Sequence, residues 1–153
     1  MSRSGHSFIK AKMREVNAIY GGEMSAHHYF RNFAYCDNGT LPWLLIAKLV
    51  GQGDRTLSAM LDTAIARFPA SGEINREVAN ADRAMQEVAA HYAAEAVHIE
   101  HLDGLSMSFD TWRFNLRKSN TEPLLRLNVE SRDDAQLMSD RTADILELID
   151  SLG

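Results

Sequence analysis

The clearest pattern of hydrophobic and polar positions lies between residues 112 and 130. Apolar side chains alternate with polar ones on both sides of a polar stretch, residues 117–123. The apolar positions are Trp112, Phe114 and Leu116 before this stretch and Leu125, Leu127 and Val129 after it. Alternation with a period of two is typical of strands that bury one face. The pattern therefore predicts two strands joined by a hairpin whose tip is residues 117–123.

The hairpin belongs to a longer region, residues 71–153, whose pattern predicts an α+β domain. Helical spacing of apolar residues predicts one helix over 81–95 and another from about residue 133 to residue 152. Short strands are predicted near residues 97–101, 104–109, 112–117 and 124–130, with turns at 103–104 and 110–111. We expect a four-stranded antiparallel sheet with two helices on one face.

Residues 1–70 have a different pattern, which predicts an incomplete α/β domain. We expect a helix over 5–16, a strand over 18–21, and helices over 41–50 and from residue 56 onward. Thr40 is the expected N-cap of the helix over 41–50. The apolar residues predicted to face a core from the last helix are Leu57, Met60, Leu61, Ala64 and Ile65. Residues 68–72 have the composition of a linker, so we place the domain boundary between residues 70 and 71.

The composition limits the kinds of partner. The chain has 153 residues, 45% of them hydrophobic, with a formal net charge of −5, so nothing general attracts it to nucleic acid or to an anionic membrane. Its single cysteine, Cys36, excludes an internal disulfide, and the six histidines show no metal-ligand spacing. No apolar run approaches the roughly 20 residues that span a bilayer. We expect a cytoplasmic protein that captures any anion locally.

The hairpin tip carries residues suited to binding an anion. Ser119, Asn120 and Thr121 offer hydroxyl, amide and backbone donors, and Arg117 offers a planar fork that fits two phosphate oxygens. An ordinary Asn-containing turn with hydrated charges accounts for the same residues, and the spacing alone favours it.

A second polar motif, Gly-Glu-Met-Ser-Ala-His, occupies residues 22–27. If this stretch is extended, Glu23, Ser25 and His27 share one face and supply acceptors and donors for vicinal sugar hydroxyls, with an imidazole suited to proton transfer. The alternative is a polar loop in which the three side chains never converge, and spacing alone favours that alternative slightly.

Both motifs resemble one family. The hairpin tip resembles the phosphate-binding loop in the last domain of the α-D-phosphohexomutases, the phosphomannomutase and phosphoglucomutase family, and residues 22–27 resemble that family's sugar-recognition loop. The motifs occur in the family's order, and the similarity extends along essentially all of the chain. The resemblance implies the second part of the family's three-layer α/β third domain, followed by the whole of its fourth domain.

The resemblance also implies roles for individual residues. Glu23 and Ser25 would hydrogen-bond sugar hydroxyls, His27 would act at the reacting centre as a general acid or base, and His6 matches another sugar-binding position. The residues that would hold the non-reacting phosphate are Arg117, Ser119, Asn120 and Thr121.

The implied parent enzyme is a phosphomannomutase, an intramolecular phosphotransferase that interconverts mannose 6-phosphate and mannose 1-phosphate. The family's phosphorylated serine and Mg²⁺-binding aspartates have no counterpart here, so we expect the chain to bind hexose phosphate without a metal or cofactor and to be inactive alone. A phosphoglucomutase of dual specificity, a non-catalytic hexose-phosphate-binding module and a structural partner domain stay open. An incomplete first domain would expose apolar surface, which predicts self-association.

Overall fold

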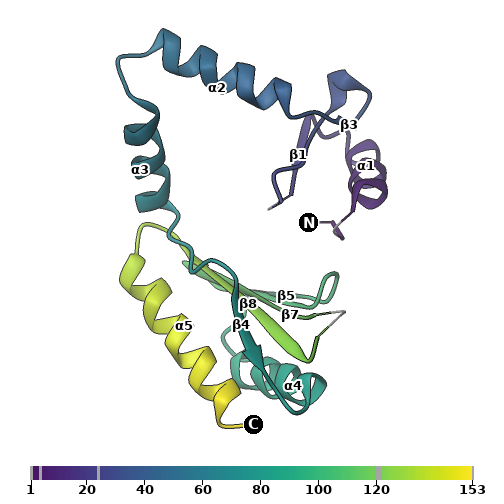
Figure 1. Ribbon diagram of the computed structural model, residues 1–153. Helices are drawn as coiled ribbons and strands as arrows, with labels where there is room; N and C mark the ends of the chain where they lie inside the picture. Colours follow the sequence, from purple (N-terminus) through teal and green to yellow (C-terminus); the bar gives the residue numbers. More distant parts are fainter. Residues whose placement is uncertain (1, 4, 24, 120–121, 153) are drawn as a thin grey trace. The chain divides into compact units, whose positions relative to one another are not determined.

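The computed structural model describes residues 2–3, 5–23, 25–119 and 122–152 of the chain. The chain forms two compact units, Met1–Met60 and Leu61–Gly153, and each is described by itself below. Figure 1 labels their helices and most of their strands. None of the helices in the part of the chain that the structure describes has both the length and the apolar character needed to cross a membrane.

The first unit is built on a small antiparallel sheet with a helix beside it. Its elements are α1 (His6–Glu15), β1 (Tyr20–Gly22), β2 (His28–Phe30), the 3-10 turn η1 (Arg31–Phe33), β3 (Cys36–Asp37), α2 (Thr40–Gln52) and the start of α3 (Leu57–Arg67). The strands lie in the order β1-β2-β3. Ile9 and Met13 of α1 and Tyr29 of β2 are buried together and form a small core.

The helix α2 differs from its prediction at its start. It begins at Thr40, and the side chain of Asn38 caps it, because Asn38 Oδ1 accepts a hydrogen bond of 2.8 Å from the backbone N–H of Leu41. The prediction that Thr40 is the cap was wrong. An Asn two residues earlier satisfies the same unpaired backbone donor.

The prediction that α3 turns a row of side chains to a core was also wrong. Among the described residues, those of α2 and α3 are all half-buried or exposed, and Leu57, Leu61 and Ile65 expose 44%, 52% and 64% of their surface. In α2, residues 43–47 are apolar without interruption and cover more than a full turn. A helix that is apolar on every side is normally a buried one.

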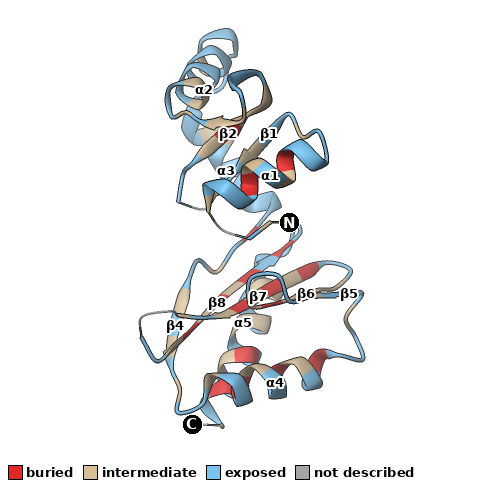
Figure 2. Cartoon of the chain, turned by 90° about the vertical axis from the view of Figure 1, so that its right-hand side faces the viewer, coloured by how far each residue is buried: buried red, intermediate tan, exposed pale blue. Residues whose placement is uncertain are grey.

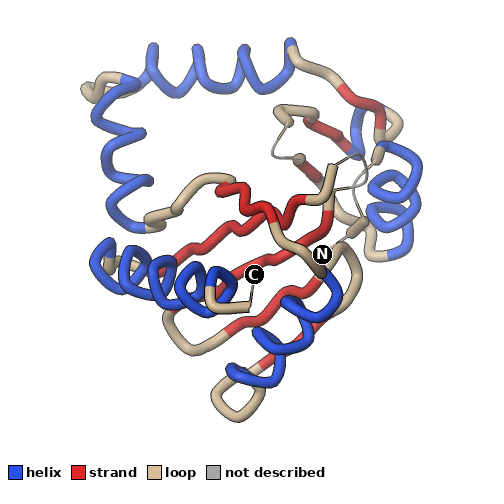
Figure 3. Tube along the Cα trace, turned by 60° about the horizontal axis from the view of Figure 1, so that its bottom comes forward, coloured by secondary structure: helices blue, strands red, loops and turns tan. Residues whose placement is uncertain are grey.

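The second unit is a five-stranded antiparallel sheet with two helices. The strands β4 (Ile74–Glu77), β5 (His98–Glu100), β6 (Leu105–Ser108), β7 (Trp112–Lys118) and β8 (Leu124–Ser131) lie in the order β4-β8-β7-β6-β5. The helices α4 (Ala81–Tyr92) and α5 (Ala135–Asp150) lie on one side of this sheet (Figure 3). The two predicted helices and the hairpin of β7 and β8 are confirmed.

The predicted count of four strands was wrong, because β4 was missed. This strand pairs with β8, with Ile74 opposite Leu127 and Arg76 opposite Leu125. Arg76 lies on the face with the helices, and its Nε is 3.4 Å from Asp150 of α5. A charged side chain at the second inward position removes the alternation that identifies a strand.

The core of the second unit follows the alternating pattern. The apolar residues of β7 and β8 are buried, and they pack against Val88 and Tyr92 of α4 and Ile145 and Ile149 of α5. Figure 2 shows this buried layer in red on the strands and on the helices that face them. Each fully buried side chain contributes roughly 1.5–3 kcal/mol, so this layer dominates the stability of the unit.

Residues 69–71, predicted as part of a linker, pair with β8 instead. Ala70 forms a bridge with Glu130, the N–H of Ser71 donates to the carbonyl of Val129 at 2.9 Å, and the N–H of Ser131 donates to the carbonyl of Pro69 at 3.0 Å. These bonds satisfy backbone groups of a stretch whose Pro and Gly content suggested no regular pairing.

The exposed apolar surface of α2 generates a prediction. We propose that the chain self-associates through this helix, because a second copy offers apolar surface that removes it from water. We expect sedimentation to show concentration-dependent association that the double substitution Leu45→Lys and Leu49→Lys abolishes, since both side chains are exposed, at 52% and 59%.

The control is the double substitution Ser139→Lys and Ala143→Lys, which adds the same two charges at exposed positions of α5. Association that survives the α2 double substitution, or a chain that stays monomeric at every concentration tested, would contradict the prediction.

Candidate functional site

The residues of the second motif form a tight turn between β1 and β2. The N–H of Glu23 donates to the carbonyl of His27 at 2.9 Å, and the N–H of Ala26 donates to the carbonyl of Glu23 at 3.0 Å. Ala26 has φ of 62°, which places it in the left-handed region. The extended conformation considered for this stretch was wrong, because these two bonds close a hairpin. Met24 lies outside the described residues.

Glu23 is held in place by two donors. The hydroxyl of Tyr29 donates to its Oε1 at 2.6 Å, and the N–H of Gly5 donates to its Oε2 at 3.4 Å. Tyr29 is 1% exposed, and burial, helped by the carboxylate of Glu23, raises the pKa of its hydroxyl to about 12. Because Gly5 precedes His6 at the start of α1, the structure brings Glu23 close to the chain segment that carries His6. Ser25 lies exposed in the turn.

His27 forms a close pair with Asp37 of β3. The distance between His27 Nδ1 and Asp37 Oδ2 is 2.6 Å, and Asp37 Oδ1 accepts a second bond of 2.9 Å from the N–H of His28. The hydrogen bond and the charge of Asp37 raise the pKa of His27, and the bond to His27 lowers the pKa of Asp37. Since a carboxylate only accepts, Nδ1 carries a proton, which leaves Nε2 to exchange one with a bound molecule.

Asp37 is a site residue that the sequence analysis missed. It was assigned to a turn because Asn38 and Gly39 follow it. The register of the small sheet places Asp37 opposite Tyr29, two residues after His27, and this pairing brings the carboxylate to the imidazole. A carboxylate that fixes the orientation and tautomer of a histidine is the arrangement found in acid–base catalysis.

The predicted phosphate loop joins β7 and β8 in the second unit. The N–H of Ser119 donates to the carbonyl of Leu124 at 2.9 Å, which closes the hairpin, and Lys118 is opposite Leu125. Asn120 and Thr121, two of the predicted phosphate-binding residues, lie outside the described residues. The hairpin tip is therefore confirmed as a connection between two strands.

Arg117 lies at the end of β7, next to the loop, and forms an ion pair with a carboxylate. Its Nη2 is 2.8 Å from Oε2 of Glu73, and Oε1 of the same carboxylate is 3.2 Å from Nη1 of Arg126. Lys118 pairs with Asp82 of α4 at 2.7 Å. The phosphate-binding role of Arg117 stays a prediction. The sequence did not reveal its pairing with Glu73, which lies far away in the sequence, just before the unpredicted strand β4.

The backbone beside Arg117 is fixed by a close approach at Gly104. This residue has φ of +82°, and a methyl group on it would lie 2.5 Å from the carbonyl oxygen of Leu116 and 2.7 Å from Cβ of Arg117. Only glycine fits such an approach without a shift of the neighbouring strand. The start of β6 therefore packs directly against the end of β7 that carries the loop.

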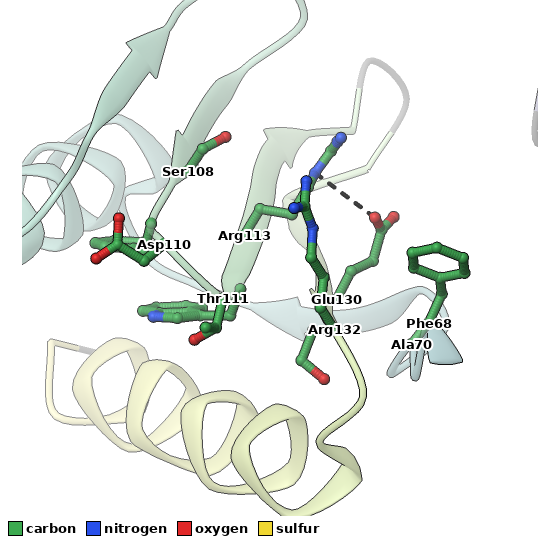
Figure 4. A pocket seen from close by; sticks show the side chains of 11 residues that line it. Phe68, Ala70, Ser108, Asp110, Thr111, Arg113, Glu130 and Arg132 are labelled. Atoms are coloured by element: carbon green, nitrogen blue, oxygen red, sulfur yellow. Dashed lines mark ion pairs between the residues drawn. The ribbon is translucent and has the colours of Figure 1, made fainter. Parts of the chain in front are cut away.

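A hollow in the second unit lies at the other end of β7 (Figure 4). It has a volume of about 460 Å³, and its walls include the stacked rings of Phe109 and Trp112 and the ion pair of Arg113 with Glu130, 3.6 Å apart. None of the described residues predicted to bind sugar or phosphate lines it. The seven residues of β7 separate this hollow from the loop by about 20 Å.

Comparisons with known proteins support the resemblance. The family model described as phosphoglucomutase/phosphomannomutase, alpha/beta/alpha domain III, matches residues 1–68, and the model of the phosphoglucomutase/phosphomannomutase C-terminal domain matches residues 73–147. The phosphomannomutase of Salmonella montevideo is 58% identical over 99% of this chain, and that of Escherichia coli strain K12 is 56% identical over 97%. The match covers 33% of each of these two proteins.

A solved structure agrees with the fold. The crystal structure of a phosphoglucomutase/phosphomannomutase family protein from Burkholderia thailandensis matches 98% of this chain and 32% of its own, with a TM-score of 0.71 and 22% identity. The chain belongs to the phosphoglucomutase/phosphomannomutase family, the α-D-phosphohexomutases. It corresponds to domain III and the C-terminal domain, and it spans about one third of the length of its curated relatives.

The pair of His27 and Asp37 generates a prediction about proton binding. Asp37→Asn should lower the pKa of His27, because the neutral amide neither attracts the imidazolium nor accepts as strong a hydrogen bond. The raised pKa of His27 means that the pair stabilises the fold below about pH 6.5 and loses this effect as pH rises through the folded pKa. The lowered pKa of Asp37 gives a contribution that is lost as pH falls through its own folded pKa.

An NMR titration of the imidazole Cε1–H resonances measures this change. The control is Asp54→Asn, which removes one negative charge from an exposed position of the same unit. An unchanged titration of His27 in Asp37→Asn, or an equal change in Asp54→Asn, would show that Asp37 does not control the proton on His27.

Proposed function

We propose that this chain supplies the sugar-recognition and phosphate-recognition loops of a phosphomannomutase that interconverts mannose 6-phosphate and mannose 1-phosphate in the cytoplasm. The observation that carries the proposal is the β1–β2 turn, where a carboxylate and a histidine are both held by hydrogen bonds. The relatives of 56–58% identity named phosphomannomutase support the assignment.

The sugar-binding role falls to the turn and to the start of α1. Each oxygen of Glu23 accepts one bond within the protein and keeps a second lone pair that can accept from a sugar hydroxyl. Ser25 offers a hydroxyl beside it, and His6 adds an imidazole from α1. We assign His27 the transfer of a proton to or from the reacting hydroxyl through Nε2, since Asp37 occupies its Nδ1.

The phosphate-binding role falls to the β7–β8 loop. Nη2 of Arg117 donates a hydrogen bond to Glu73, and the other N–H groups of its guanidinium can donate to an anion. Ser119, Asn120 and Thr121 would add hydroxyl, amide and backbone donors around the same phosphate. A phosphate held here is the one that does not react, so its binding orients the sugar while the chemistry occurs at the other end.

The remaining parts of the reaction are assigned to groups outside this sequence. Among the described residues, no group of three His, Cys, Asp or Glu side chains is arranged to hold a metal ion. The nucleophilic serine and the Mg²⁺ that the family implies would supply the covalent relay and charge neutralisation.

A second candidate function is a hexose-phosphate-binding module without catalysis. It would need both loops but neither the nucleophilic serine nor the metal. Glucose phosphates are an alternative substrate for either function.

The phosphate-binding role predicts the effect of Arg117→Ala. We expect it to weaken binding of mannose 6-phosphate by about one to two decades, because a charge-assisted hydrogen bond is worth roughly 1.5–3 kcal/mol. The melting temperature should change little, since Arg117 and Glu73 are 35% and 30% exposed and such ion pairs contribute about 0–1 kcal/mol.

Calorimetric titration measures the affinity, and Arg113→Ala is the matched control, because Arg113 lies on the same strand and pairs with Glu130. Equal losses in the two variants, or a loss that appears only with unfolding, would make Arg117 a structural residue.

Because the nucleophilic serine and the Mg²⁺ are assigned to other parts of the parent enzyme, the proposal predicts how the isolated chain behaves. With Mg²⁺ and a bisphosphorylated hexose present, it should show no phosphomannomutase turnover, while it binds hexose phosphates with dissociation constants on the order of millimolar, near 4 kcal/mol. A coupled assay for mannose 6-phosphate tests for turnover, and a calorimetric titration tests for binding. Turnover by the purified chain would require a nucleophile within residues 1–153 and would overturn the assignment.

A further inference from the structure

Two arginines lie directly opposite each other at the end of the second unit's central hairpin. The register of β7 and β8 pairs Arg117 with Arg126. Side chains at directly opposite positions of antiparallel strands are about 5 Å apart at Cβ, and like charges at such positions destabilise the sheet. The hairpin therefore carries a concentrated positive charge that something must compensate.

Glu73 compensates this charge with both of its oxygens. Oε2 accepts from Nη2 of Arg117 at 2.8 Å, and Oε1 accepts from Nη1 of Arg126 at 3.2 Å. One carboxylate between two guanidinium groups leaves one net positive charge. The three side chains are 28% to 35% exposed, so an anion in solution can reach them.

The bonds of Arg126 are incomplete in this arrangement. Its Nε is buried and has no hydrogen-bond partner among the described residues. Buried donors in proteins are normally paired, and leaving one unpaired costs about 1–3 kcal/mol. Arg126 thus has hydrogen bonds to gain if its guanidinium turns toward a larger anion than the carboxylate of Glu73.

We propose that Arg117 and Arg126 form a two-arginine clamp for the phosphate group of a hexose phosphate, and that Glu73 occupies the clamp as an internal anion until the phosphate displaces it. This inference rests on the proposed function, and it adds Arg126 as a binding residue and Glu73 as a competitor. A phosphate brings up to two negative charges and three terminal oxygens, whereas the carboxylate brings one charge and two oxygens. Planar guanidinium forks bind phosphate oxygens in pairs, so the exchange increases both charge pairing and hydrogen bonding.

The clamp makes opposite predictions for its two kinds of residue. Arg126→Gln should weaken binding of inorganic phosphate and of mannose 6-phosphate by about three- to tenfold, and it should make the affinity less dependent on salt, because one cation is lost. Glu73→Gln should strengthen binding by a similar factor, because it frees both guanidinium groups and removes a competing negative charge. Arg126→Lys keeps the charge and loses the fork, so its affinity should lie between those of the wild type and Arg126→Gln.

Calorimetric titrations of the full chain with both ligands at two salt concentrations measure these effects. Arg113→Gln is the control, since this arginine lies two pairs further along the same hairpin face, opposite Glu130, and should leave affinity unchanged. Thermal unfolding of each variant shows whether the fold is kept, and Arg126→Lys serves if Arg126→Gln does not fold.

The outcomes separate the clamp from the proposed function. If Arg117→Ala weakens binding while Arg126→Gln and Arg126→Lys do not, or if folded Glu73→Gln binds phosphate no more tightly than the wild type, the clamp is wrong and the phosphate loop stands. If the wild-type chain binds neither ligand, or if Arg117→Ala leaves binding unchanged, the proposed function itself fails.

Discussion

The second unit depends on the burial of one face of its central hairpin. The inward side chains of β7 and β8 pack against α4 and α5, and the polar side chains between them are thereby turned to the opposite face of the sheet. A shift of one residue in register would exchange the two faces, so the apolar layer fixes which side chains are turned outward. In the register of this hairpin, Arg117 lies opposite Arg126 and Arg113 lies opposite Glu130.

The first unit is held by polar contacts more than by a large core. Its buried cluster contains Ile9, Met13 and Tyr29, and the hydroxyl of Tyr29 ties this cluster to Glu23 in the turn. Asp37 joins β3 to the same turn through His27 and the backbone of His28. Low-dielectric surroundings around Tyr29 strengthen such bonds, so a small core can hold a polar turn in one conformation.

The same electrostatic arrangement recurs in both units. In a chain with a net charge of −5, several basic side chains near the two motifs lie beside a carboxylate: His27 beside Asp37, Arg117 and Arg126 beside Glu73, and Lys118 beside Asp82. The carboxylate of Asp37 controls which ring nitrogen of His27 carries a proton. The carboxylate of Glu73 instead neutralises positive charge on Arg117 and Arg126 that a phosphate would otherwise meet. Binding an anion at the hairpin is then an exchange of partners, which makes affinity depend on the carboxylate as well as on the arginine.

The sequence by itself determined the hairpin, the helices of the second unit, the order of the two motifs and the family, because periodicity and short motifs are local. It missed β4, because Arg76 takes an inward position and pairs with Asp150, and it misjudged residues 69–71, because their partners lie in β8. Only the tertiary structure showed that Asp37 meets His27 and that Glu73 joins Arg117 to Arg126. These contacts cross 10 to 53 residues of chain, and strand register, which no local pattern specifies, decides which charges become neighbours.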